Sequence, residues 1–455
     1  MPITSIAPKA ISILGNPSSL VPIMVKDGVA CVSLTNYAYN NGGKVEALDR
    51  GIDEFGTAAI WIGGIPFFKK LIDKTVYKMS NINPDIDIRI IRDKQYSDWA
   101  KKNAQGIINE KTGQTVLSAI EGSLNKASKA KGLYLGKIIA STALTLGSYF
   151  ALTKFRQKTT QKRVEKEILG AKPAQTTDKN QQKSDKKTSV DSEGKNVTFN
   201  SVFAPFVNKQ PSFKGLGSSL VDGILFNPVH NMKLIDAGIS GQRLGQSRNS
   251  TELAEYAIKE GALFCFIYFL GDAIQKGVNS LSEKVFKKPI DLDIKVLMSE
   301  DIKNGLKNGK IAEELSKIPV KESNLTDVLD FIVKNPENIV VKAAKQSGII
   351  STLKNAEGKE IVDVSKYISK DAFYGIANNL KKIDSYFSKS GINIESFMKK
   401  AKGLKVASVF CNVLSSCFVL GYVVPELMYG YREKKRGSKK FHVAEDIKNT
   451  EGVKA

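Results

Sequence analysis

The chain has 455 residues, of which 42% are hydrophobic and 25% are charged, as is ordinary for a globular protein of two or three domains. Its 68 Lys and Arg outnumber its 46 Asp and Glu, and the net charge of +22 suits an anionic partner such as nucleic acid or lipid head groups. Four scattered cysteines exclude a disulfide framework, and two histidines without a Cys-x-x-Cys pair exclude the usual zinc sites.

Two short motifs that each occur twice predict an internal duplication. Residues 85–89 read DIDIR and residues 291–295 read DLDIK, while residues 130–133 and 401–404 both read AKGL. Each AKGL motif leads into a long apolar segment that carries Leu-Gly and ends in basic residues. We therefore expect a mainly α, internally duplicated, membrane-associated fold with a short amphipathic strand in each copy.

The stretches that precede these motifs also repeat, at a constant offset. The matched pairs are Glu46 with Glu252, Ile52 with Ile258, and Glu54 with Glu260. On this basis the chain divides into residues 1–24 as an irregular start, 25–153 as the first copy, 154–212 as a basic linker, 213–435 as the second copy and 436–455 as a basic, polar tail.

Prolines and glycines mark the irregular stretches of the two copies. Four prolines between residues 2 and 22 disfavour helix, so the first 24 residues are expected to be irregular. Glycines predict a loop at Gly42 and Gly43 in the first copy and at Gly238, Gly241 and Gly245 in the second, because glycine readily adopts the positive φ angles of turns.

Each copy contains two apolar segments. Residues 55–68 and 261–274 are each about 14 residues long, short of the roughly 20 that a spanning helix needs, and suit a re-entrant, interfacial or buried helix. Residues 132–153 and 406–430 are about 22–25 residues long, which is enough to span. We expect four membrane-inserted segments. The alternative is a soluble protein with long buried helices.

Alternation of polar and apolar residues predicts short strands. Residues 85–90 place three isoleucines on one face and Asp85, Asp87 and Arg89 on the other. The pattern recurs at residues 291–295, so each copy is expected to carry one such strand. A further strand is expected within the alternating residues 359–365.

The second copy is longer because of an insertion, residues 298–400, which we expect to be a soluble helical part. Apolar periodicity and capping signals predict its helices at residues 325–333, 338–345, 371–388 and 394–402. In the first copy the same signals predict helices at residues 96–105 and 115–129.

Two basic regions set the expected orientation. The linker, residues 154–212, is rich in Lys, Gln, Thr, Asp and Ser and is expected to be disordered. A second basic run, residues 432–440, leads into the C-terminal tail. Because cytoplasmic loops of membrane proteins are enriched in Lys and Arg, the linker and the tail are both predicted to be cytoplasmic.

The sequence carries no familiar catalytic motif. It has no G-x-x-x-x-G-K-[ST] loop, no G-x-S-x-G elbow and no H-E-x-x-H pair. We expect a protein without an enzymatic site, a cofactor or a metal. The basic runs lack interleaved aromatic residues, so nucleic acid is an unfavoured partner.

The repeated aspartate pairs are candidate binding residues. Asp85 with Asp87, and Asp291 with Asp293, would each share a strand face, where paired carboxylates can hold a divalent cation. Arg89 and Lys295 lie on the same two faces and can neutralise the carboxylates, which favours an ordinary solvated surface instead.

Two charges inside apolar segments are further candidate binding residues. A charge in the bilayer is costly and often functional, which singles out Asp272. Lys137 lies near the start of its segment, where its long side chain reaches the bilayer surface.

The expected function follows from this layout. The sequence favours a non-enzymatic integral membrane protein that binds anionic membrane lipid through its basic regions and protein partners through the 298–400 insertion. One alternative is a small-solute transporter or pore built from the two repeats, with an unknown ligand. Another is a soluble, basic two-domain protein that binds nucleic acid.

Overall fold

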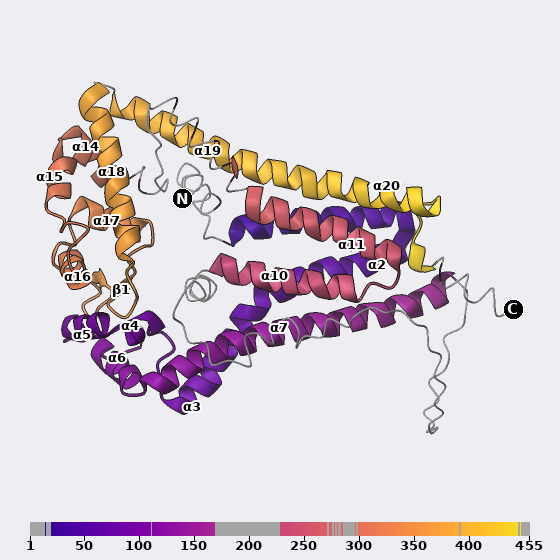
Figure 1. Cartoon of the computed structure of the whole chain (residues 1–455), viewed down its shortest axis with the longest axis horizontal. Helices are drawn as coiled ribbons and strands as arrows, with labels where there is room; N and C mark the ends of the chain where they lie inside the picture. Colours follow the sequence, from indigo (N-terminus) through magenta and orange to yellow (C-terminus); the bar gives the residue numbers. More distant parts are fainter. Residues whose placement is uncertain are drawn as a thin grey trace. The chain divides into compact units, whose positions relative to one another are not determined.

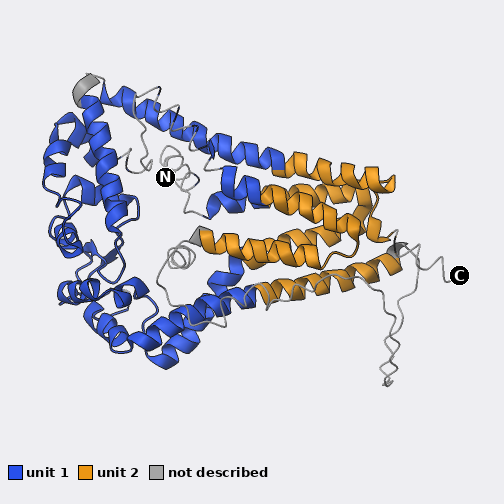
Figure 2. Ribbon diagram, viewed as in Figure 1, with its two compact units in different colours: residues 1–27, 62–145, 264–419 blue, residues 28–61, 146–263, 420–455 orange. Residues whose placement is uncertain are grey.

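The computed structural model describes residues 20–110, 112–168, 228–270, 299–390 and 393–444, with a few single positions outside these ranges (Figure 1). These residues are mainly helical, as predicted. The chain separates into two compact units, each assembled from three stretches (Figure 2). Unit 1 contains Met1–Asp27, Ile62–Thr145 and Phe264–Val419, and unit 2 contains Gly28–Trp61, Leu146–Leu263 and Leu420–Ala455.

Unit 2 is a bundle of helices. Helix α11 packs against both α10 and α20. Four elements lie entirely in the unit: η2 (Val164–Ile168), α10 (Pro228–Gly245), α11 (Ser250–Leu263) and α20 (Val424–Arg436). Three others contribute a part of their length: α2 (Val21–Ile72), α7 (Ala127–Arg163) and η4 (Val419–Val423).

Helix α2 folds back on itself at the predicted glycine loop. Gly43 has φ +78° and ψ −170°, which breaks the helix there. On either side of the break the two arms come close, since a Cβ added at Gly51 would lie 3.6 Å from Cγ2 of Thr35. The loop predicted at Gly43 is thus confirmed as a sharp break. The helix begins at Val21, within the stretch expected to be irregular, because its first turn accommodates Pro22.

The second predicted glycine loop is wrong at Gly238 and Gly241, whereas Gly245 ends α10 directly before the connection to α11. Gly238 and Gly241 lie inside helix α10, where Ile235 and Ile239 are fully buried at helical spacing. A Cβ added at Gly238 would lie 3.0 Å from Cδ2 of Leu146, so the glycine lets α10 approach α7 closely. This glycine serves packing within a helix and does not mark a turn.

Unit 1 contains parts of α2 and α7 together with the remaining elements. These remaining elements are η1 (Asp73–Tyr77), α3 (Lys78–Ser80), α4 (Ile88–Arg92), α5 (Lys94–Asn103), α6 (Val116–Leu124), η3 (Phe264–Phe269), α14 (Glu300–Lys307), α15 (Lys310–Ser316), α16 (Leu325–Lys334), α17 (Ile339–Gln346), β1 (Thr352–Lys354), β2 (Glu360–Val362), α18 (Lys370–Ser390) and α19 (Ile394–Phe418).

The strand predicted at residues 85–90 is wrong. The stretch forms a turn followed by helix α4, Ile88–Arg92. Asp87 caps this helix, because its carboxylate accepts a hydrogen bond from the backbone N–H of Arg89 at 2.9 Å. Alternation over so few residues fits one helical turn as well as a strand. The matching stretch, residues 291–295, lies outside the described residues.

Three of the helices predicted within residues 298–400 are confirmed within a residue or two, as α16, α17 and α18. The fourth begins at the predicted residue but continues to Phe418 as α19. The predicted strand at residues 359–365 is present as β2, which pairs with β1 in an antiparallel hairpin. The turn between them contains Gly358 at φ +73°. The predicted helices of the first copy are present as α5 and as α6 with the start of α7.

Helix α5 and part of residues 298–400 pack together in unit 1. Helix α5 packs against α16, and the indole N–H of Trp99 donates to the carboxylate of Asp330 at 2.8 Å. The hydroxyl of Tyr96 accepts from the backbone N–H of Ile368 at 2.7 Å and donates to the carbonyl of Lys366 at 3.2 Å. Residues 298–400 are therefore joined to α5 by both apolar packing and hydrogen bonds.

Three helical runs among the described residues are long and apolar enough to cross a membrane, namely Val21–Ser80, Ala127–Lys166 and Ile394–Arg436. Each run contains an apolar stretch of 18 residues, and only 17%, 39% and 22% of these stretches, in the same order, is buried within the protein. These runs contain three of the four predicted segments. The fourth, residues 261–274, is not among them, and part of it lies outside the described residues.

Candidate functional site

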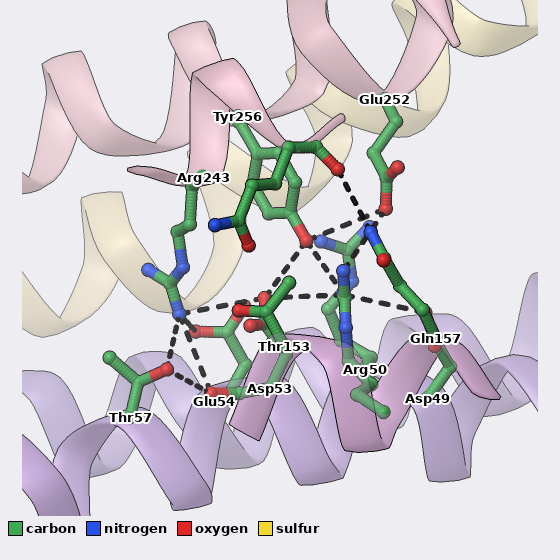
Figure 3. A network of polar contacts seen from close by, with 12 residues as sticks. Asp49, Arg50, Asp53, Glu54, Thr57, Thr153, Gln157, Arg243, Glu252 and Tyr256 are labelled. Atoms are coloured by element: carbon green, nitrogen blue, oxygen red, sulfur yellow. Dashed lines mark hydrogen bonds and ion pairs between the residues drawn. The ribbon is translucent and has the colours of Figure 1, made fainter. Parts of the chain in front are cut away.

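Unit 2 encloses a network of charged side chains shielded from solvent (Figure 3). Two helices supply most of it, each with its charged residues about one turn apart, so that they line one face. From α2 come Glu46, Asp49, Arg50, Asp53 and Glu54; from α11 come Glu252, Glu255, Tyr256, Lys259 and Glu260. All of these residues are at most 5% exposed. The face that is normally apolar in a helical bundle is ionic here.

Arg156 of α7 joins the two helices. Its guanidinium lies 3.5 Å from the carboxylates of Asp49 and Asp53 on α2, and 3.5 Å from that of Glu252 on α11. It also donates a hydrogen bond to the hydroxyl of Tyr256 at 2.7 Å. One buried cation thus neutralises acids from two different helices.

Arg432 of α20 makes a second junction of the same kind. Its guanidinium lies 2.8 Å from the carboxylate of Glu46 on α2. Toward α11 it donates two hydrogen bonds to Glu255, at 2.6 and 3.0 Å. Arg50 pairs with the same Glu255 at 2.9 Å, so this carboxylate is held by two arginines.

Arg243 of α10 extends the network along the bundle. It is ion-paired with Glu260 and donates to the hydroxyls of Thr57 at 3.0 Å and Tyr149 at 3.1 Å. Beside it, Lys259 pairs with Glu54 at 2.5 Å. The acids and bases here neutralise each other, which is the condition for burying charge.

The segment after α20 covers one end of this network. Phe441 and Ala444 join Val45 and Val164 in a small apolar cluster. His442 is 1% exposed, and its Nε2 lies 3.8 Å from the carboxylate of Glu255. The C-terminal segment thus adds both apolar and polar contacts to the bundle.

The buried arginines keep the carboxylates of α11 ionised. Burial alone would raise the pKa of Glu252, yet Arg248 and Arg156 lower this pKa below its usual value. Burial likewise opposes ionisation of Glu260, and Arg243 lowers the pKa of this carboxyl more than burial raises it. Protonating either group would therefore break an ion pair inside the bundle.

The network is a set of buried ion pairs that connects the helices of unit 2. No group of three or more His, Cys, Asp or Glu side chains suited to hold a metal occurs in the described part of the chain. Each of the acids and bases named above is paired with another member of the network. Removing one partner would leave a buried charge uncompensated, which is strongly destabilising.

The candidate residues predicted from the sequence lie apart from this network. Lys137 pairs with Asp73 at 2.7 Å and lies over the ring of Tyr77. Asp87 caps α4 and pairs with Arg89 at 2.6 Å.

Asp85 lines a polar cavity of about 590 Å³ in unit 1, together with Asp73 and Asn81. It is not brought next to Asp87 on a strand face, because the expected strand is absent. The other predicted residues, Asp272, Asp291 and Asp293, lie outside the described residues.

The sequence alone does not predict the network, although its acidic residues are visible as a repeated pattern. In the sequence, Glu46, Glu54, Glu252 and Glu260 indicate a duplication. Their helical spacing on two segments of mixed charge indicates a shared ionic face, but their arginine partners lie far away in the sequence. No family model, curated protein or solved structure matches the chain.

Proposed function

We propose that the chain is a non-enzymatic, internally duplicated integral membrane protein that binds protein partners and anionic lipid. The observation that carries the proposal is the exposure of large apolar side chains along the three candidate spans. The exposed residues include Phe55, Phe67, Leu144, Phe150, Phe410, Leu414 and Phe418. Water-exposed apolar surface of this extent is unusual for a soluble monomer, whereas lipid accommodates it.

The duplication is supported by the way both copies fold locally. In the first copy, α2 turns back at Gly43; in the second, α10 and α11 pack against each other across a short connection. The offset that matches Glu46 with Glu252 also matches Asp49 with Glu255. Arg156 contacts Asp49 and Glu252. The offset converts these two positions into Glu255 and Glu46, the two acids that Arg432 contacts. Arg156 contacts Asp53 in addition.

Lipid binding is supported by the basic ends of two spans in unit 2. Lys154, Lys158 and Lys162 are exposed at the end of α7, and Lys434 and Lys435 at the end of α20. Lysines beside a span attract the anionic head groups of the cytoplasmic leaflet. The linker and the tail are accordingly placed in the cytoplasm in this proposal.

Protein binding is supported by an apolar groove in unit 1. Its volume is about 610 Å³, and its lining includes Leu315, Ile318, Val320 and Tyr374. Val320 is 67% exposed, although it is a large aliphatic side chain. Grooves of this kind suit an apolar side chain of a partner.

Fractionation of cells that express the full chain tests membrane insertion. We expect that washes with high salt and then with alkali leave the protein in the membrane and that only detergent releases it. Release by salt alone would contradict the proposal and favour a soluble basic protein that binds nucleic acid, whose binding to DNA or RNA would then weaken with salt.

Thiol labelling gives an independent test. Cys411 is exposed on the protein but lies within a candidate span, so lipid should shield it from a membrane-impermeant maleimide. In single-cysteine variants, Cys411 is expected to react only after denaturation. The matched control is Lys307→Cys on the exposed surface of α14, which should react once membranes are permeabilised. Equal labelling of both would contradict insertion.

A second candidate is a small-solute transporter or pore. One observation favours it: charges from α2 and α11, one helix from each proposed copy, converge inside unit 2. Duplicated transporters often place their site between the repeats. The variant Asp272→Asn is the test, with loss of solute movement and unchanged folding expected for a transporter. Normal movement in that variant would exclude a role for this aspartate.

A further inference from the structure

Lys26 is a buried cation that the ionic network does not use. It lies on α2 within unit 1 and is only 1% exposed. Among the described residues, no carboxylate is paired with its ammonium group, in contrast to Lys137 and Lys259. A buried charge without a counter-ion is costly unless polar oxygens replace its hydration.

Two neutral oxygens accept hydrogen bonds from this ammonium. Nζ donates to the side-chain oxygen of Asn412 at 2.8 Å and to the backbone carbonyl of Phe266 at 3.3 Å. The hydroxyl of Ser416 lies 3.2 Å from the same carbonyl and 2.8 Å from the backbone carbonyl of Asn412, so it can donate to either. An ammonium is only a donor, which fixes the Asn412 amide with its oxygen toward Lys26.

The backbone around Phe266 has the wide turn of a π-helix, η3 (Phe264–Phe269). Such turns loosen the regular backbone bonding and recur at functional sites. The carbonyl of Phe266 is consequently available to two side chains. In transporters, carbonyls of irregular helices within the membrane coordinate monovalent cations in this way.

We propose that Lys26, Phe266, Asn412 and Ser416 form a site for a potassium-sized monovalent cation, which the ammonium of Lys26 itself fills when protonated. Carbonyl, amide and hydroxyl oxygens without a carboxylate suit a singly charged ion. The two N···O distances suit an ion of the size of ammonium, and K⁺ is of that size. When Lys26 releases a proton to solvent, K⁺ replaces that proton. The lone pair of the amine then becomes a ligand of K⁺, and the net charge of the site is unchanged.

The test uses purified full-length protein and K⁺ itself as the probe. In Lys26→Ala, about 0.3 M KCl is expected to raise the Tm by about 3–6 °C relative to N-methyl-D-glucamine chloride at the same ionic strength. The wild-type protein at pH 7 should show no such difference, because its ammonium fills the site. The double variant Lys26→Ala/Asn412→Leu should lose the response. The control Lys137→Ala should show none.

A second measurement needs no variant that must fold. At about pH 8.5 in weak buffer, adding KCl to the wild-type protein is expected to release protons, whereas N-methyl-D-glucamine chloride should release none. Equal Tm values of Lys26→Ala in the two salts, or no proton release by K⁺, would overturn the proposal. Fractionation tests membrane insertion separately, so either proposal can fail without the other.

Discussion

Arg432 and Glu255 are joined by two hydrogen bonds, of 2.6 and 3.0 Å, and neither side chain is exposed to solvent. The pair connects α20, close to the C-terminus, with α11 in the middle of the chain. Because both charges are removed from water, each depends on the other to remain buried. The stability of unit 2 should therefore respond strongly to either residue.

We predict that Arg432→Met lowers the free energy of unfolding by about 3–5 kcal/mol, because Glu255 and Glu46 lose a buried cation. Lys434→Met, an exposed change on the same helix, should change it by less than about 0.5 kcal/mol. Chemical denaturation of the two variants measures the difference. Similar values for both would show that the pair contributes little.

Acid should destabilise unit 2. Burial opposes ionisation of Glu252, Glu255 and Glu260, but their basic partners lower each pKa below its unfolded value, so the unfolded chain binds protons more readily than the folded one. The stabilisation is present above the unfolded glutamate pKa of about 4.3 and is lost as the pH falls through the lowered folded values.

Denaturation at a series of pH values measures this effect. We expect a nearly constant free energy of unfolding between about pH 8 and 6 and a steep fall below about pH 5. In Glu260→Gln the fall should be shallower, since one titrating group is removed. Constant stability down to pH 3 would contradict the assignment of ionised carboxylates.

The fold was predictable where the signal is local. Helices α16, α17 and α18 follow from apolar periodicity and from caps such as Asn338, whose side chain accepts from the N–H of Val340. The glycines were harder to interpret. Gly43 breaks α2, whereas Gly238 lies inside α10. The reason for a glycine at position 238 is the nearby side chain of Leu146, which the local sequence does not show.

The ionic network was predictable only in part. The repeated acids on two helical segments are visible in the sequence, but Arg156 and Arg432 meet them through tertiary contacts that no local pattern encodes. An arginine within the basic end of a helix is normally predicted to be exposed to solvent. Its burial depends on how the distant helices pack.

Tyr96 of α5 links this helix to Lys366 and Ile368 within unit 1. In Tyr96→Phe the buried N–H of Ile368 loses its acceptor, so we expect a loss of about 1–3 kcal/mol in the free energy of unfolding. Tyr39→Phe, at a residue 60% exposed, is the control and should be nearly neutral. Faster amide exchange at Ile368 in the first variant alone would locate the effect, and unchanged exchange there would contradict it.

Two glycines of α10 should respond differently to alanine. A Cβ at Gly241 meets nothing within 4 Å, so Gly241→Ala should stabilise the helix by about 0.5–1 kcal/mol. At Gly238 the Cβ would lie 3.0 Å from Leu146, which is 2% exposed and has little room to move. Gly238→Ala is therefore expected to be less stable than Gly241→Ala by about 1 kcal/mol or more. Thermal unfolding compares them, and equal Tm values would mean that α10 and α7 do not pack closely at Gly238.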